Sequence, residues 1–162
     1  MIQEGFKRFY LPERRFQVLF YTKDYLVIDD YAHHPTEINA TLQTLAQGDY
    51  KRIIAVFQPH RFTRLERLMD HFTTCFAKAD QLILAEIYSA NQQEIKNINS
   101  RLLTEKIKAS GYQNVIYIED FQDIIEYLGK NIKQGDAVVF LSAGNLTQIA
   151  HQFAKHMEAI HK

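Results

Sequence analysis

The stretch VIDDYAHHPTEI, residues 27–38, joins an apolar run to a helical pattern through a turn rich in titratable side chains. The apolar run stops on Asp29 and Asp30, and a tyrosine and two histidines follow. Pro35 then opens the helical pattern, and proline is favoured at the first helical position because its missing N–H has no partner there. The stretch therefore predicts a strand, a polar turn and a helix.

Six short apolar runs along the chain are predicted to be strands. They are residues 16–22, 25–29, 52–57, 81–87, 114–118 and 137–142. Only Lys23 and Asp24 separate the first two runs, which predicts an antiparallel hairpin. The later runs are continuously apolar, which is typical of parallel strands that are covered on both faces.

Apolar side chains recur at helical spacing after each of the last five runs. They are Ile38, Leu42 and Leu45; Leu65, Leu68, Met69, Phe72 and Phe76; Leu103 and Ile107; Ile124, Ile125 and Leu128; and Ile149, Phe153 and Met157. Thr63 with Glu66 has the spacing of a capping box, and Ser100 and Asp120 are predicted N-caps. The alternation predicts a Rossmann-like α/β fold, in which a mostly parallel six-stranded sheet with an antiparallel N-terminal strand has helices on both faces.

The composition is that of one soluble globular domain. Of the 162 residues, 46% are hydrophobic and 23% are charged, and a chain of this length can bury a single core. Basic and acidic residues number 19 each, which argues against a general nucleic-acid or membrane-surface binder, since both need a cationic field. Cys75 has no partner for an internal disulfide, and no apolar run reaches the length of a membrane span. Because residues 1–16 lack the apolar core of a signal peptide, we expect a cytoplasmic protein.

Polar segments follow four of the predicted strands at the point where each strand ends. They are DDYAHH at 29–34, QPHRFTR at 58–64, EIYSAN at 86–91 and SAGN at 142–145. Ligands of open α/β sheets bind beyond the carboxyl ends of the strands. We therefore expect these four segments to converge on one edge of the sheet and to form a site.

His60, Arg61 and Arg64 lie between a strand end and the start of a predicted helix. Helix N-termini present free N–H groups and the positive end of the helix dipole, and guanidinium groups bind carboxylates and phosphates bidentately. The segment therefore predicts a clamp for a carboxylate or a phosphate. The alternative is a solvated basic turn in which Arg64, Glu66 and Arg67 form surface ion pairs.

The acidic and histidine side chains of the opening stretch allow several interpretations. Asp29 and Asp30 could hold a sugar hydroxyl or a metal, or they could be turn residues. His33, His34 and His60 could form a metal site, although either of the adjacent histidines could simply cap the turn. No paired helical spacing and no cysteine supports a metal, so none is predicted.

Three further features bear on nucleotide binding. Arg14 and Arg15 lie at the first predicted strand, where charge can also protect an edge strand from aggregation. Gly144 lies at a strand-to-helix turn, where glycine lets the backbone approach a ligand. The sequence contains neither GxxxxGK[ST] nor GxGxxG, so the phosphates of a nucleotide would have to be held mainly by another domain.

Taken together, the segments RRFQ, DDYAHHPTEI, FQPHRFTR and SAGN resemble the C-terminal domain of the Mur ligases. The resemblance runs from about Phe9 to His151. It is strongest to the branch of the family that adds L-alanine to UDP-N-acetylmuramate in peptidoglycan synthesis. A second branch, which recycles murein tripeptide, usually carries phenylalanine in place of Tyr31 and lacks the QPHR form.

The resemblance implies a three-domain, ATP-dependent ligase, of which residues 1–162 would be the third domain only. A first domain would bind the UDP sugar, and a central domain would carry the phosphate loop and the main magnesium ligands; neither is expected in this chain. In the family reaction, ATP phosphorylates the muramate carboxylate, which is then joined to the amine of L-alanine. We accordingly expect the isolated domain to be inactive.

The resemblance also implies site residues, motif by motif. Arg15 would approach the nucleotide phosphates, and Asp30 would hold the ATP ribose. The residues implied around L-alanine and its carboxylate are Tyr31, His33, His60, Arg61 and Arg64. No residue of this domain alone is implied to be catalytic. The chain departs from the family at Ser142, where glycine is often found, and at Glu86, where aspartate is common.

An alternative outside the family is a free-standing module that binds a small anion or a partner protein. It rests on the basic cluster at the helix start and on the missing phosphate loop. Such a module would have no ligase activity.

Overall fold

One sheet of six strands organises the computed structural model, which describes residues 14–161. The strands are Gln17–Tyr21 (β1), Tyr25–Asp30 (β2), Arg52–Phe57 (β3), Gln81–Leu84 (β4), Val115–Tyr117 (β5) and Asp136–Leu141 (β6), in the spatial order β1-β2-β6-β3-β4-β5. β1 pairs antiparallel with β2, and every other pair is parallel. The predicted sheet and hairpin are confirmed. The start of the family resemblance at Phe9 lies outside the described residues.

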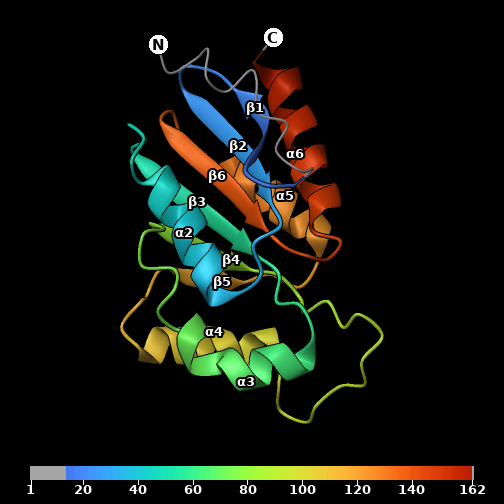
Figure 1. Cartoon of the computed structure of the whole chain (residues 1–162). Coiled ribbons are helices and arrows are strands. Elements are labelled where there is room, and N and C mark those ends of the chain that lie inside the picture. The colour runs from blue at the N-terminus through green and yellow to red at the C-terminus, as the bar shows by residue number, and fades with distance from the viewer. Residues whose placement is uncertain (1–13, 162) are drawn as a thin grey trace.

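Helices cover both faces of the sheet (Figure 1). They are Pro35–Leu45 (α2), Phe62–Phe72 (α3), Ser100–Ala109 (α4), Phe121–Asn131 (α5) and Thr147–Ile160 (α6). α2, α3 and α4 pack on one face, and α5 and α6 pack on the other. All five correspond to predicted helices. Within residues 14–161, none of them has the length and apolar character that crossing a bilayer requires.

The continuous apolar strands follow from this three-layer arrangement. In β3, Ile53, Ala55 and Phe57 face the side of α2, α3 and α4. Ile54 and Val56 face the side of α5 and α6. Because successive side chains of a strand point to opposite faces, a strand covered on both faces is apolar at nearly every position.

The start of α3 differs from the prediction. The helix begins at Phe62 and its N-cap is Arg61, so the predicted capping box of Thr63 and Glu66 is wrong. Arg61 has a φ of 70° and its N–H donates to the Tyr88 carbonyl at 2.8 Å. This tertiary hydrogen bond turns the chain into the helix before Thr63 is reached.

Of the other two predicted caps, Asp120 is confirmed and Ser100 is wrong. Asp120 caps α5, and its Oδ1 accepts from the N–H of Gln122 at 2.6 Å. Ser100, however, is the first residue of α4, and the cap is Asn99, whose Oδ1 accepts from the N–H of Leu102 at 2.9 Å. Asparagine and serine cap about equally well, so the spacing alone did not separate these neighbours.

We predict that Phe57→Ala lowers the free energy of unfolding by about 4 kcal/mol, because it leaves a cavity in a close-packed core. The Phe57 side chain is fully buried, with ring centroids of Phe72 and Phe76 at 5.4 and 5.3 Å. Urea unfolding followed by circular dichroism measures the change. Ile160→Ala, at a side chain that is 53% exposed, is the control and should change stability by less than about 0.5 kcal/mol. A loss below about 1 kcal/mol for Phe57→Ala would contradict this packing.

Candidate functional site

The carboxyl ends of β2, β3, β4 and β6 meet at one edge of the sheet. Asp30 and Phe57 both align with Leu141 of β6, and Phe57 also aligns with Leu84 of β4. Beyond the strands, the segments after β3 and β4 stay together through a bridge between His60 and Tyr88. β4 is therefore shorter than predicted. It ends at Leu84, and residues 85–88 run alongside the QPHR segment instead of continuing the strand. The predicted convergence of the four polar segments is confirmed.

Asp30 forms part of the wall of a pocket of about 530 Å³ beside α2. Its Oδ2 accepts from the N–H of Phe16 at 2.7 Å, and its Oδ1 accepts from the N–H of Ala32 at 2.8 Å. Burial raises the pKa of Asp30, and these hydrogen bonds offset only part of the effect. Arg15 is exposed and lines the same pocket. The structure thus brings together the two residues that the resemblance assigned to ATP.

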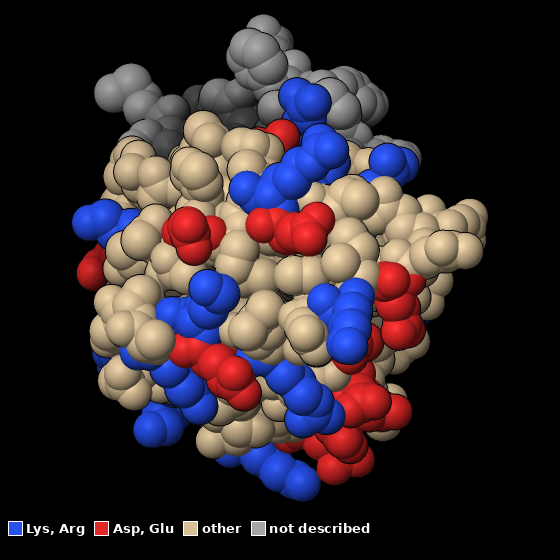
Figure 2. All heavy atoms as spheres, turned by 90° about the horizontal axis from the view of Figure 1, so that it is seen from below, with Lys and Arg blue, Asp and Glu red and all other residues tan. Residues whose placement is uncertain are grey.

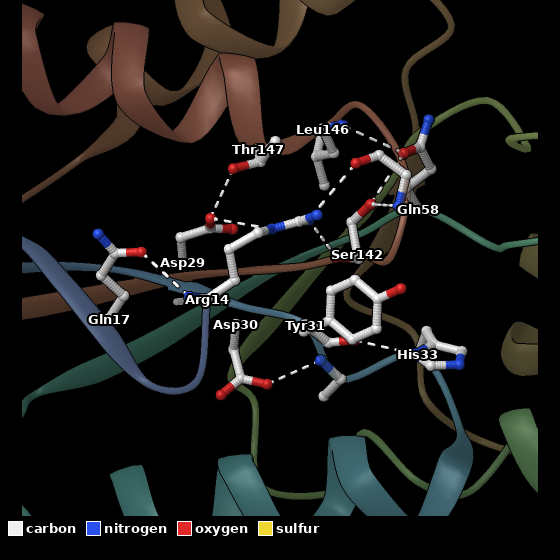
Figure 3. A network of polar contacts seen from close by, with 12 residues as sticks. Arg14, Gln17, Asp29, Asp30, Tyr31, His33, Gln58, Ser142, Leu146 and Thr147 are labelled. Carbon is white, nitrogen blue, oxygen red and sulfur yellow. Dashed lines mark hydrogen bonds and ion pairs between the residues drawn. The ribbon is translucent and has the colours of Figure 1, made fainter. Parts of the chain in front are cut away.

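Arg14 is the arginine that is built into the sheet edge, a role that sequence reasoning missed (Figure 3). Its Nη2 donates to the carbonyl of Ser142, and its Nε lies 3.5 Å from Oδ2 of Asp29. Asp29 is fully buried, and Thr147 Oγ1 donates to the same oxygen at 2.6 Å. A buried carboxylate needs a cation and hydrogen bonds. The available signal was therefore Asp29 inside an apolar strand, with two arginines just upstream.

Tyr31 is placed by contacts on two sides. The Arg14 guanidinium carbon lies 5.0 Å from the centroid of the Tyr31 ring, and the Tyr31 N–H donates to the Arg14 carbonyl at 2.6 Å. His33 lies edge-to-face at 5.3 Å between ring centroids. The Tyr31 side chain still remains 44% exposed, so a ligand can reach it.

His60 is a neutral histidine beside two arginines. Its ring stacks on Tyr88 at 5.4 Å and lies 5.8 Å from the ring of His33. Arg64 Nη1 lies 3.0 Å from His60 Nδ1 and donates to the His60 carbonyl at 3.2 Å. Burial, followed by the charges of Arg64 and its neighbours, lowers the pKa of His60 to about 4. Arg61, which the resemblance assigned to the same site, is exposed at the start of α3.

Gln58 is a second residue whose role sequence reasoning missed. It is 2% exposed, and its Nε2 donates to Asn145 Oδ1 at 2.9 Å and to the carbonyl of Glu86 at 3.2 Å. Its Oε1 accepts from Ser142 Oγ at 2.9 Å and from the N–H of Leu146 at 3.2 Å. One buried amide therefore ties together the turns after β3, β4 and β6. A glutamine that directly follows a buried strand was the available signal.

His34 caps α2, as one interpretation of the sequence allowed. Its Nδ1 accepts from the N–H of Thr36 at 3.3 Å, and Glu37 completes a capping box. Across residues 14–161 no three histidine, cysteine, aspartate or glutamate side chains are grouped to hold a metal ion. The metal alternative therefore has no support in this part of the chain.

The surface charges are mixed. Figure 2 shows lysine and arginine side chains interleaved with aspartate and glutamate on the face seen from below. This agrees with the equal numbers of basic and acidic residues. The face that Figure 2 shows therefore carries no broad cationic field.

Residues 14–144 match the family model described as Mur ligase, glutamate ligase domain. The chain belongs to the Mur ligase family. It is 40% identical over 159 residues to the UDP-N-acetylmuramate–L-alanine ligase of Acetivibrio thermocellus, a match that covers 98% of this chain and 34% of that relative. The chain thus spans about a third of the length of this curated relative.

Solved Mur ligase structures share the fold of this domain. The UDP-N-acetylmuramate–alanine ligase of Thermotoga maritima superposes with a TM-score of 0.72 at 23% identity, over 91% of this chain and 30% of that one. The MurF ligase of T. maritima, solved in complex with ADP, gives a TM-score of 0.65 at 18% identity, over 94% and 33%. This Mur ligase domain therefore has the fold that the resemblance implied.

Both departures from the family pattern make specific contacts in this Mur ligase domain. The Ser142 hydroxyl donates to Gln58 and accepts from the N–H of Gly144 at 2.8 Å, which a glycine could not do. The longer Glu86 side chain accepts a hydrogen bond from the Tyr117 hydroxyl. Each departure therefore adds a hydrogen bond within the site edge or beside it.

We predict that Gly144→Ala destabilises the Mur ligase domain by about 2 kcal/mol through overpacking. A Cβ at this position would lie 2.6 Å from Gln58 Oε1 and 2.7 Å from Cγ of Tyr88, both of which are held in place. Gly129→Ala is the matched control, since its Cβ would meet only the side chain of His156, at 3.3 Å, and alanine is favoured inside a helix. Thermal unfolding compares the two variants. Equal stability of both would show that the turn at Gly144 relaxes freely.

We also predict that His60 titrates near pH 4 in the folded domain, as measured by the NMR shift of its ring protons. Its ordinary pKa is 6.5, so the unfolded chain takes up this proton first. The stabilisation from neutral His60 is therefore complete above pH 6.5 and is lost as the pH falls toward 4. Arg64→Gln should raise the pKa of His60 only part of the way, because burial is the larger cause. A midpoint near 6.5 in the unmodified chain would contradict the burial of this ring.

Proposed function

We propose that this chain is the C-terminal domain of an ATP-dependent ligase that adds L-alanine to UDP-N-acetylmuramate in peptidoglycan synthesis. One observation carries the proposal, namely that two features lie along one sheet edge and share Tyr31. The first is the group of His33, His60 and Arg64, here called the amino-acid cluster, and the second is the pocket beside Asp30. An amide-forming ligase needs its amine donor and its nucleotide next to each other. The proposal also places the reaction in the cytoplasm, where ATP is available.

The arginines would bind the carboxylate of the amino acid. Arg61 and Arg64 line a recess of about 300 Å³ at the start of α3. Because Arg64 donates to Nδ1 of the neutral His60, the hydrogen of that ring is on Nε2, where it can be donated to a carboxylate oxygen. Charge-assisted and bidentate hydrogen bonds of this kind are strong and directional.

The pocket beside Asp30 fits a nucleoside. Each oxygen of its carboxylate accepts one backbone hydrogen bond, which leaves further acceptor capacity toward a ribose hydroxyl. Arg15, exposed on the rim of this pocket, would contact phosphate. ATP, when bound, supplies the phosphoryl group that activates the carboxylate. We assign no magnesium ligand to this domain and leave the ion to the rest of the ligase.

The contribution of this domain would be positioning and protection. Holding an amine against an activated carboxyl group removes much of the entropic cost of a bimolecular reaction. Closure of the domain over the other domains would also exclude water, which competes with the amine for the activated group. On its own the domain can supply neither the activated group nor the enclosure.

The proposal is tested by joining this chain to the rest of the Acetivibrio thermocellus ligase, in place of the third that it matches. We expect this reconstituted ligase to release phosphate only when UDP-N-acetylmuramate, ATP and L-alanine are all present. Arg61→Ala should raise the KM for L-alanine about tenfold or more, because a charge-assisted bond is lost. Asp30→Ala should raise the KM for ATP instead. Arg101→Ala, in an exposed ion pair with Glu119, is the control and should change neither.

Two results would contradict the proposal. One is robust phosphate release by the isolated chain, which would show that it is a complete enzyme. The other is an inactive reconstituted ligase together with no binding of L-alanine to the isolated chain by calorimetry. Tight binding of an unrelated anion, abolished by Arg61→Ala, would then favour a free-standing anion-binding module.

A further inference from the structure

The two histidines of the amino-acid cluster carry their hydrogens on opposite nitrogens. His33 Nδ1 lies 2.9 Å from the carbonyl oxygen of Tyr31, which can only accept, so the hydrogen of His33 is on Nδ1. His60 Nδ1 lies 3.0 Å from Nη1 of Arg64, which can only donate, so the hydrogen of His60 is on Nε2. In their neutral forms the two rings thus offer an acceptor on His33 and a donor on His60. Adjacent ammonium and carboxylate groups are what an α-amino acid presents in return.

Glu37 faces the Nδ1 side of His33. Its Oε2 accepts from the N–H groups of His33 and His34, at 3.1 Å each, and lies 3.5 Å from His33 Nδ1. Burial raises the pKa of Glu37, but these backbone hydrogen bonds and the neighbouring histidines outweigh it, so the pKa is lowered overall. The group is therefore a carboxylate at neutral pH. A carboxylate on one side of an imidazole and a free nitrogen on the other is the arrangement of an oriented general base.

His33 Nε2 is available for such a role. Within the described range, 14–161, no side chain forms a hydrogen bond with it. His60, 5.8 Å away between ring centroids, has a pKa of about 4 and stays neutral at physiological pH. A proton taken up by His33 therefore lies beside a neutral ring rather than a second cationic ring, and the Glu37 carboxylate offsets the positive charge of nearby Arg64.

We propose that His33 accepts the proton of the incoming amino acid and that Glu37 is its positioning residue, a role that rests on the proposed function. L-alanine arrives as an ammonium ion, which has no lone pair. The proton passes to His33 Nε2, and the electron pair of the broken N–H bond becomes the lone pair of the amine. The C–N bond to the activated muramate carboxyl group then forms as the C–O bond to phosphate breaks. The amine nitrogen gives its second proton to the departing phosphate, which leaves as hydrogen phosphate. Glu37 stabilises the resulting imidazolium.

The turnover test compares L-alanine with 3-fluoro-L-alanine in the reconstituted ligase. Fluorine withdraws electrons, so the ammonium group of the analogue loses its proton more readily and needs less help. We expect His33→Gln to lower kcat about 100-fold or more with L-alanine, the usual size of a general-base contribution, and less than about tenfold with the analogue. Glu37→Gln, which keeps an oxygen for the cap of α2, should lose about tenfold with L-alanine and also recover with the analogue. His71→Gln, an exposed histidine of α3, is the control and should change neither rate.

Equal losses with both amino acids would overturn the proposal, because a purely structural role affects both alike. The isolated chain gives an independent readout, since imidazole ¹⁵N shifts report which nitrogen carries hydrogen. We expect His33 protonated on Nδ1 and His60 on Nε2, and His33 protonated on Nε2 would also overturn the proposal. If the unmodified reconstituted ligase uses L-alanine but either result goes against His33, this inference fails alone. If it does not use L-alanine, the proposed function fails and the inference with it.

Discussion

The pairing of Asp29 with Arg14 at the end of β2 is the constraint on which the site depends. Asp29 is fully buried, and an uncompensated carboxylate there would cost several kilocalories per mole. Arg14 forms an ion pair with Asp29, and its guanidinium also donates a hydrogen bond to the carbonyl of Ser142. These contacts connect the segment before β1 to the turn after β6. The same guanidinium lies over the ring of Tyr31. One charge requirement inside the sheet thus sets the position of a side chain in the proposed amino-acid site.

A second buried polar group holds the other half of the edge. Gln58 spans the turns after β4 and β6, and a glycine at 144 leaves room for this amide against Tyr88. Tyr88 in turn supports the ring of His60. Buried, fully hydrogen-bonded groups of this kind make the surrounding geometry specific. Gln58 and Tyr88 therefore position His60, which is proposed to contact the ligand, without contacting the ligand themselves.

The proposed chemistry depends on the different electrostatic surroundings of His60 and His33. Burial and Arg64 keep His60 neutral, whereas Glu37 places a carboxylate beside His33. In the proposed mechanism, these two histidines would therefore have different roles, His60 as a hydrogen-bond donor and His33 as a proton acceptor. The pocket at Asp30, which is proposed to hold the nucleotide, is next to this pair through Tyr31 and α2. In the proposed function, the amino acid and the nucleotide would therefore bind next to each other along one sheet edge.

The sequence by itself determined the layers of this protein. The spacing of apolar residues shows which strands are covered on both faces and which side of each helix is buried. It also placed Asp30, Tyr31, His33, His60 and Arg64 at one edge, since parallel strands end on the same side. Only the tertiary structure decided which neighbour takes which role. Arg14 rather than its neighbour enters the network, Asn99 rather than Ser100 caps α4, and α3 begins before Thr63. The choice of Arg14 depends on a buried charge and the start of α3 on a long-range hydrogen bond to Tyr88, and local spacing contains no information about such distant partners. The cap of α4 is a local contact, but asparagine and serine cap about equally well, so the sequence did not distinguish them.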